Sequence, residues 1–510
     1  MNISVELINN HKYYNHICIC LLLMLALLVR VIFFSGGICG GDAFAYARHA
    51  YDIASGKYEL NAIHGFYGFR YFVLLTTALS FAGFGVNDIA ASFFPFIFSL
   101  LNVLVVYFIA ERTFNRTIAL ISSILLIFYP LDIIQANVVS PDSFIPLLSS
   151  LSILLYIIAE KKSSFVFPRN FLLSLSGALI AFAYMSRVTS IFLFFSLTIF
   201  QIYRKKYKYL LCSTLGLFIP LAVEALYFYI FTGDPFFEFH RITEPSIAYT
   251  VKNDYDLSLL YYPKIMFGYD LTGLAYFGLT WWLVVGGLIL AWIKRDIKIL
   301  FIAICLIIPF FGFEFGFQSL KEGILISKNY PYLSLITGPA MIIGAYFIYH
   351  IQAYLRIDIK LEQRILLFTL VLLASMNVYG TYRLYANLRD DVKPYKIVAD
   401  FLKKRPNSTV YTHHFRWPLS LCYFLEYDPS YNFIDLNHID KANVKKLSDA
   451  YVILNRRYIE ADVIGRTLPL DSFVARYAKR PPQSWGKCLS YSGNPSYNSV
   501  DIYYVPKSTN

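Results

Sequence analysis

Acidic side chains that could do chemistry occur next to long apolar runs. Asp42 follows the first such run, in Gly40-Gly41-Asp42-Ala43-Phe44, and Asp142 opens a later one, in Ser140-Pro141-Asp142. Each has a structural interpretation, because Asp is favoured at a helix start, where free backbone N–H groups and the helix dipole stabilise its charge. Each also has a chemical one, because a carboxylate can take a proton from a hydroxyl group. Spacing alone favours the helix cap for Asp42 and leaves the two interpretations of Asp142 level.

Basic side chains occur in the same polar segments. They are Arg70, Arg187, Lys321 and Lys328, while Asp132, in Tyr129-Pro130-Leu131-Asp132, is expected to be a solvated turn residue. Isolated cations near helix ends usually extend to lipid headgroups. Several cations that face carboxylates suit a phosphate, which Arg binds through a bidentate fork. The combined pattern predicts a cation cluster for a lipid phosphate beside a carboxylate base.

The elements that must position these residues are membrane spans. The 510 residues are 57% hydrophobic and only 15% charged, whereas a soluble domain usually carries about 25% charged residues. Apolar runs long enough to cross a bilayer are residues 17–36, 88–110, 117–136, 141–159, 170–186, 188–203, 208–231, 272–293, 299–316, 332–350 and 363–383. Arg187 divides 170–203 into two spans. The sequence therefore predicts an all-α polytopic membrane domain with about 11 transmembrane helices.

The distribution of basic residues predicts an orientation. Alternate loops carry the Lys and Arg residues, including those near 112–116, 161–169, 204–208, 294–298 and 356–364, so this side is expected to be cytoplasmic. The N-terminus is then inside and the C-terminus outside. The net charge of +12 follows from this pattern, and it does not indicate a nucleic-acid partner, which would need a basic patch on one soluble face.

Two regions outside the spans have their own organisation. In residues 37–87 the stretches 43–54 and 71–84 predict helices that lie in the membrane interface. From residue 385 the composition becomes polar, with a helical pattern at 394–404 and strand-like pieces at 408–412, 431–436, 451–455 and 500–505. We therefore expect a transmembrane catalytic domain over 1–384 and a small extracytoplasmic α/β domain over 385–510. Cys422 and Cys488 could form a disulfide there.

The order of short motifs carries a resemblance to a known class. After Asp42 come Phe84-Gly85-Val86, Asn87-Asp88-Ile89-Ala90-Ala91, Tyr107-Phe108-Ile109-Ala110-Glu111-Arg112, Tyr129-Pro130-Leu131-Asp132 and Ser140-Pro141-Asp142, and much later Lys328-Asn329-Tyr330-Pro331-Tyr332. This order resembles the GT-C class membrane glycosyltransferases, in the group of dolichyl-phosphate-mannose–protein mannosyltransferases and aminoarabinose transferases (glycosyltransferase family 39-like). The resemblance is clearest over residues 17–200.

The resemblance implies an inverting transfer of a sugar from a polyprenyl-phosphate donor to a hydroxyl acceptor (lipid, glycan or protein) on the outer face of the plasma (inner) membrane. Asp42 matches the catalytic base and Asp142 a second acidic position. Arg70 and Lys328, with Arg187, match donor phosphate-binding positions, and His64, Tyr67, Asp132 and Tyr330 are expected acceptor or donor contacts. No nucleotide, metal or other cofactor is expected. Ala43 replaces the second acid of the Asp-Glu pair often found in this class, so the resemblance does not define the substrate.

A transporter or lipid flippase is the alternative. Its ionisable residues would lie midway through spans, within paired broken segments. Here they gather at one mouth, and Glu224, Glu314 and His350 are the in-span exceptions considered. A pocket lined by Asp42, Asp142 and Arg70 would favour the transferase, and a continuous polar path would favour transport.

Overall fold

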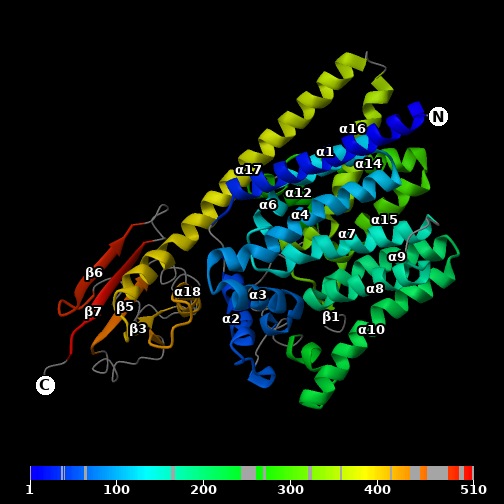
Figure 1. Cartoon of the computed structure of the whole chain (residues 1–510). Coiled ribbons are helices and arrows are strands. Elements are labelled where there is room, and N and C mark those ends of the chain that lie inside the picture. Colours follow the sequence, from blue (N-terminus) through cyan, green and yellow to red (C-terminus); the bar gives the residue numbers. More distant parts are fainter. Residues whose placement is uncertain are drawn as a thin grey trace.

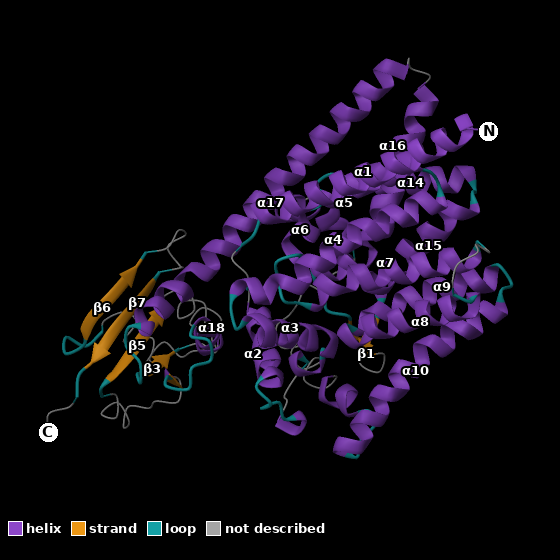
Figure 2. Cartoon of the chain, viewed as in Figure 1, coloured by secondary structure: helices purple, strands orange, loops and turns teal. Residues whose placement is uncertain are grey.

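A helical bundle and a small sheet make up the molecule, joined by one long helix, α17 (Ile359–Lys403) (Figure 1). The computed structural model describes residues 2–35, 38, 41–62, 66–161, 167–242, 260–267, 271–319, 324–355, 359–413, 416–436, 448–455, 481–492 and 499–507. The five-stranded sheet lies wholly at the C-terminal end (Figure 2). This arrangement confirms the predicted fold class.

The bundle holds the apolar helices. They are α1 (Asn2–Ile32), α4 (Asp88–Thr113), α5 (Arg116–Ile127), α6 (Pro130–Gln135), α7 (Pro141–Glu160), α8 (Arg169–Ser186), α9 (Ile191–Tyr203), α10 (Tyr207–Thr232), α12 (Tyr261–Met266), α13 (Leu271–Phe277), α14 (Thr280–Lys294), α15 (Ile297–Phe315) and α16 (Thr337–Leu355). Among the described residues, 6 helices are long and apolar enough to cross a membrane, and further apolar helices are shorter. The number eleven stays a prediction.

Local sequence signals explain many helix boundaries. The Asn87 side chain caps α4 by accepting a hydrogen bond from the Ala90 N–H, and Asn115 caps α5 in the same way. Pro141 opens α7, as the Ser-Pro-Asp signal predicts. The predicted division of 170–203 is also confirmed, because α8 ends at Ser186 and Arg187 has extended backbone angles.

Three predicted boundaries are wrong. The span 117–136 is two helices, because Tyr129-Pro130 interrupts it and Pro130 starts α6. The span 272–293 is likewise divided at Gly278, whose φ of +58° ends α13. Conversely, the separate helices at 363–383 and 394–404 form one continuous α17. Polar composition marks where a helix leaves an apolar environment, but it does not end the helix.

The segment between the first two long helices folds as expected. It contains α2 (Gly41–Ala54) and α3 (Tyr71–Phe84), with short 3₁₀ turns at Leu60–Ala62 (η1) and Tyr67–Phe69 (η2). The two helices pack together around a core that includes Phe44, Ala47, Val73 and Phe81. Their position in the membrane interface stays a prediction. Elsewhere in the bundle, 3₁₀ turns occupy Val188–Ser190 (η3) and Tyr330–Ile336 (η4), and β1 (Phe317–Ser319) pairs with β2 (Ile324–Leu325).

The C-terminal part is an α/β unit, as predicted. Its strands are β3 (Thr409–Thr412), β4 (Asn432–Asp435), β5 (Ala450–Asn455), β6 (Gly486–Tyr491) and β7 (Val500–Val505), in the order β4-β3-β5-β7-β6. The first three are parallel, and β7 runs antiparallel to both its neighbours. β6 was not predicted from the sequence, and α18 (Arg416–Phe424), which lies between β3 and β4, was not assigned a range. The boundary at 384/385 stays a prediction, and α17 runs through it.

Aromatic contacts hold this unit on the bundle. Phe44 of α2 meets Tyr423 and Phe424 of α18 at centroid distances of 5.7 and 5.6 Å. Tyr51 stacks on Tyr427 at 4.3 Å, and Lys396 of α17 pairs with Asp88 at 2.7 Å. Cys422 and Cys488 are free thiols, so the considered disulfide is absent.

Candidate functional site

Asp42 lies in the first turn of α2 with its side chain exposed. It is the second residue of the helix, so the cap position expected from spacing belongs to an earlier residue. The Tyr67 hydroxyl donates a hydrogen bond of 2.8 Å to Asp42 Oδ1. Tyr46, one turn later on the same helix, is buried, and its ring meets that of Tyr67 at 5.3 Å. The carboxylate is therefore oriented by Tyr67 while it remains open to an approaching group.

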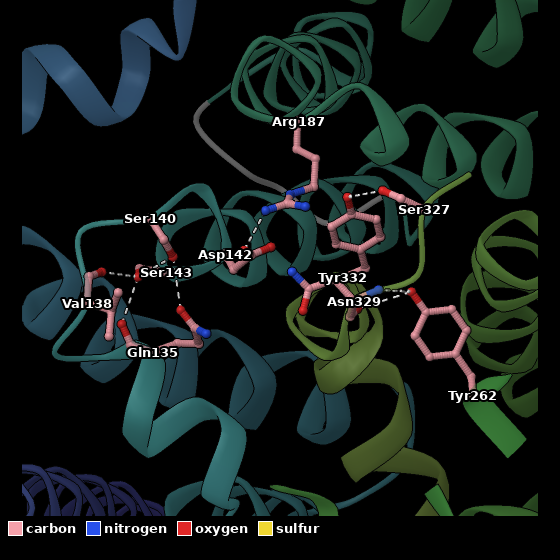
Figure 3. A network of polar contacts seen from close by, with 10 residues as sticks. All are labelled: Gln135, Val138, Ser140, Asp142, Ser143, Arg187, Tyr262, Ser327, Asn329 and Tyr332. Carbon is pink, nitrogen blue, oxygen red and sulfur yellow. Dashed lines mark hydrogen bonds and ion pairs between the residues drawn. The ribbon is translucent and has the colours of Figure 1, made fainter. Parts of the chain in front are cut away.

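Asp142 and Arg187 form the second part of the site (Figure 3). Arg187 Nη2 lies 2.6 Å from Asp142 Oδ2, and the guanidinium carbon lies 4.2 Å from the centroid of the Tyr332 ring. Asp142 is buried and its Oδ1 has no hydrogen-bond partner. One oxygen of this carboxylate is thus bound by a cation and the other is free to accept a hydrogen bond.

Hydrogen bonds in the loop before α7 fix the position of Asp142. Ser140 Oγ donates to Gln135 Oε1 at 2.9 Å, and Ser143 Oγ contacts the carbonyl oxygens of Gln135 and Val138. Figure 3 shows these side chains beside Asp142, on the side away from Tyr332. The predicted helix start at Asp142 is therefore held by these hydrogen bonds and by the ion pair with Arg187.

Arg70 adds a buried guanidinium to the same site. It precedes α3, is only 8% exposed, and its Nε and Nη1 have no hydrogen-bond partner. Arg70 acts electrostatically on Asp142 and on Tyr46. Asp42, Asp142 and Arg187 also act electrostatically on the Tyr46 hydroxyl, so all four charged groups lie within electrostatic range of it. Burial raises the pKa of Tyr46, which remains a neutral hydrogen-bond donor.

A pair of carboxyl groups lies on the other side of Arg70. Glu224 of α10 and Glu238, in the helical stretch 237–242, share a hydrogen bond, and Arg70 interacts with both. Burial and the neighbouring Glu224 raise the pKa of Glu238 to about 8, against the opposing effect of Arg70. Neither residue was predicted as a site residue. From the sequence, Glu224 was considered only as an ionisable residue within a span.

Lys328 lies in an adjoining network. Its Nζ lies 2.6 Å from Glu314 Oε1, and both side chains are fully buried. Glu314 also accepts hydrogen bonds from the backbone N–H groups of Tyr261 and Tyr262. The Tyr262 hydroxyl bonds the Asn329 backbone, next to Tyr330, whose ring stacks with Tyr276 at 4.7 Å. Lys328 therefore has a carboxylate partner in this structure, and its role in binding phosphate stays a prediction.

Asp132 corrects the expectation of a solvated turn. It is buried, lies 2.6 Å from Arg30 Nη2, and accepts a hydrogen bond of 2.7 Å from Ser99. Arg30 is fully buried and also donates to the Ile127 carbonyl oxygen. The ion pair links α1 to α6 and does not contact the residues around Tyr46 through any described interaction. Predicted residues His64 and Lys321 lie outside the described residues.

The sequence did not identify Tyr46, Tyr332, Glu224 and Glu238 as site residues. Tyr46 could have been found, because it lies four residues after Asp42 on one helix face. The other three come from distant segments, and no local pattern links them. Within the described residues no three His, Cys, Asp or Glu side chains are grouped to hold a metal ion. Metal independence stays a prediction.

Comparison with known proteins finds a related family and similar folds. The sequence profile of the family described as dolichyl-phosphate-mannose-protein mannosyltransferase matches residues 70–229. This segment carries Arg70, Asp142 and Arg187. No curated protein sequence gives a match to the chain.

Solved structures match over nearly the whole length. ArnT from Cupriavidus metallidurans in the apo state has a TM-score of 0.63 at 14% identity, with 95% of this chain and 97% of that chain covered. The same protein bound to undecaprenyl phosphate has a TM-score of 0.61, with the same identity and coverage. The Archaeoglobus fulgidus oligosaccharyltransferase tethered with an acceptor peptide has a TM-score of 0.55 at 10% identity, with 97% of this chain and 74% of that chain covered. The resemblance to GT-C class membrane glycosyltransferases is confirmed.

Proposed function

We propose that this chain transfers a sugar from a polyprenyl-phosphate donor to a hydroxyl group of an acceptor. The observation that carries the proposal is a pair of guanidinium groups, Arg70 and Arg187, each with at least one buried nitrogen that has no hydrogen-bond partner, next to the carboxylate of Asp142. The exposed carboxylate of Asp42 is hydrogen-bonded to Tyr67, whose ring packs on that of Tyr46. Cations beside an available carboxylate provide what this reaction needs, namely a holder for phosphate and an acceptor of a proton. One of the matched structures has undecaprenyl phosphate bound, which supports a lipid-linked donor.

The two arginines hold the donor phosphate. Arg70 Nε and Nη1 and Arg187 Nε are buried donors without hydrogen-bond partners. An isolated buried donor costs about 1–3 kcal/mol, and a phosphate oxygen would remove that cost with strong, charge-assisted bonds. Lys328 could join them only by sharing its contact with Glu314. The Tyr46 hydroxyl would donate a hydrogen bond to a phosphate oxygen.

Asp42 acts as the base. Its carboxylate takes the proton of the acceptor hydroxyl, whose oxygen then forms a bond to the anomeric carbon of the donor. The bond from that carbon to the phosphate oxygen breaks, and polyprenyl phosphate leaves with the electron pair. Attack opposite to the leaving group inverts the anomeric configuration. Arg70 and Arg187 stabilise the negative charge that grows on the phosphate, which lowers the barrier.

The membrane placement belongs to the same proposal. The donor enters laterally from the outer leaflet of the plasma (inner) membrane, with the N-terminus in the cytoplasm and the C-terminal domain outside. His64, Tyr67, Asp132 and Tyr330 were expected as substrate contacts. Of these, Tyr67 is retained beside Asp42, and Asp132 is given a structural role with Arg30.

Sugar transfer by Asp42→Asn tests the base. The substitution keeps the size of the side chain and removes its ability to accept a proton, so kcat falls by roughly 10²–10⁴-fold. The matched control is Asp52→Asn on the same helix, whose carboxylate pairs with Arg48 and lies away from the site. Equal transfer rates for wild type and Asp42→Asn would disprove the assignment.

A further inference from the structure

A second cationic site lies away from the proposed catalytic residues. A cavity of about 390 Å³ opens between the end of α1 and the polar half of α17, lined by Ser35, Arg389, Val392, Lys393 and Lys396. Phe33 and Tyr385 hold the two helices together here, with ring centroids 6.0 Å apart. No carboxylate is among the lining residues, so the wall is both polar and positively charged.

The helix geometry of α17 separates charges that alternate in the sequence. Arg389, Lys393 and Lys396 are spaced i, i+4 and i+7, which places them on one face. Asp390 and Asp391 follow Arg389 directly and point to other faces of the helix. The sequence therefore looks mixed in charge, and the fold presents a basic face to the cavity.

The neighbours of the three cations leave positive charge unneutralised. Lys396 pairs with Asp88 at 2.7 Å, and both side chains are partly exposed. Arg389 is exposed and lies 3.7 Å from Asp390. Exposed pairs of this kind contribute little. Lys393 has no carboxylate partner among the described residues, and its Nζ lies 5.7 Å from the ring of Tyr491 on β6. The cavity thus carries at least one cation available to an anion.

The surface of α17 indicates the level at which this cavity lies. Exposed apolar side chains (Leu367, Phe368, Val371 and Leu372) are followed by exposed Tyr379 and Tyr382. Tyrosines concentrate where a span passes from hydrocarbon to headgroups. Arg389, the first of the three cations, lies seven residues after Tyr382, or about 10 Å further along the axis of α17. The cations are therefore positioned at the headgroup layer, where α17 leaves the bilayer.

We propose that this cavity binds the phosphate group of a membrane lipid at the junction of α1, α17 and the C-terminal sheet. Phosphate suits Arg and Lys donors that converge from one face, and it also accepts from the Ser35 hydroxyl. The volume lies near the lower end of the roughly 300–1,000 Å³ of small-molecule sites, so a headgroup fits and the lipid chains remain in the bilayer. The bound lipid holds the C-terminal domain against the membrane, through Lys393 and the neighbouring Tyr491. This site does not depend on the proposed transfer reaction.

Thermal unfolding of the full-length protein in detergent tests the proposal. Phosphatidic acid raises the unfolding temperature of wild type, whereas diacylglycerol, which has the same chains without phosphate, does not. The double variant Arg389→Gln/Lys393→Gln needs at least about tenfold more phosphatidic acid for the same shift, because two charge-assisted contacts are lost. Arg383→Gln, on the same helix but outside the cavity, responds as wild type does.

Two further arms make the outcome decisive. If inorganic phosphate competes with phosphatidic acid, the site is supported and its affinity is assigned to the phosphate group. If only the lipid produces a response, the site is supported with a contribution from the acyl chains. The unfolding temperature without lipid shows that the double variant is folded, as expected for exposed side chains. Equal responses to phosphatidic acid and diacylglycerol, or an unchanged response in the double variant, would overturn the proposal.

Discussion

Arg70 is buried with two guanidinium nitrogens that have no hydrogen-bond partner. Each such donor costs about 1–3 kcal/mol, and the nearby Glu224, Glu238 and Asp142 reduce the cost of the charge without making hydrogen bonds to those nitrogens. The folded chain therefore maintains an unfavourable arrangement at one place. The proposed donor phosphate would accept hydrogen bonds from these nitrogens and remove this cost.

Substitution of Arg70 tests this explanation. Arg70→Gln removes the charge and the bidentate fork, so the donor KM rises by about tenfold or more, the cost of one charge-assisted hydrogen bond. Arg70→Lys restores the charge alone and recovers only part of the loss. Arg48→Gln is the control, since Arg48 contacts Asp52 and Tyr427 instead. A donor KM that does not change in Arg70→Gln would contradict the phosphate assignment.

Glu238 makes stability depend on pH. Its pKa of about 8 in the folded chain exceeds the value of about 4.3 for an ordinary Glu, so the folded state holds this proton more tightly. The resulting stability is complete below about pH 4.3 and is lost as pH rises through 8. Arg70, Glu224 and the tyrosines at 58, 71 and 184 are the titratable or charged groups with a described interaction with Glu238.

Thermal unfolding of wild type and Glu238→Gln between pH 5.5 and 8.5 would measure this effect, because Gln keeps the hydrogen-bonding capacity without the titration. We expect the unfolding temperature of wild type to fall across this range relative to that of Glu238→Gln. Parallel curves for the two proteins would show that Glu238 does not titrate in this window.

At the scale of elements, apolar patterning predicted where helices occur. Which helices pair through buried charges depends on residues far apart in the sequence. The limits of α2 and α3, the start of α7 and the break at Arg187 followed from local signals. The pairs Arg30–Asp132 and Glu314–Lys328 did not, because each joins segments that lie far apart in the chain. Hydrophobicity indicates which residues are buried, but it does not indicate which buried charged residues form an ion pair.

The break between α13 and α14 is an element feature that can be tested. Gly278 has φ +58°, and a Cβ there would lie 1.9 Å from Asn377 Oδ1 of α17. Gly278→Ala is therefore expected to destabilise the protein by about 1–2 kcal/mol from the backbone conformation alone, with a further cost from the clash. Gly83→Ala, where no atom lies within 4 Å, is the control. Equal unfolding temperatures for the two variants would refute this explanation.

At the scale of the whole molecule, the C-terminal unit and the membrane bundle are joined above the site. The aromatic contacts of Phe44 and Tyr51 with α18 and Tyr427 fix α2, the helix that carries Asp42. Continuity of α17 links the sheet rigidly to the bundle. The sequence predicted a polar domain with strands but not its attachment, because the contacting aromatic residues have no pattern that distinguishes them from core residues.

The packing of the whole molecule also explains which site residues could be predicted from the sequence. Asp42, Asp142, Arg70 and Arg187 were predicted, and they interact with one another or with Tyr46. All four lie at or next to the end of a helix. Lys328 has a buried carboxylate partner that only the packing of α15 against η4 creates. The proposed donor and acceptor are assigned from the four predicted residues and not from Lys328.

The stoichiometry and stereochemistry of transfer test the central claim most directly. The purified full-length protein would be incubated in lipid nanodiscs with polyprenyl-phosphate sugars and cell-envelope acceptors, and transferred sugar and released polyprenyl phosphate would be measured together. We predict one polyprenyl phosphate released for each sugar transferred, with inversion at the anomeric carbon and with transfer by Asp42→Asn slowed roughly 10²–10⁴-fold. Transfer from a nucleotide sugar without a lipid-linked donor, or a product with retained configuration, would contradict the proposed function.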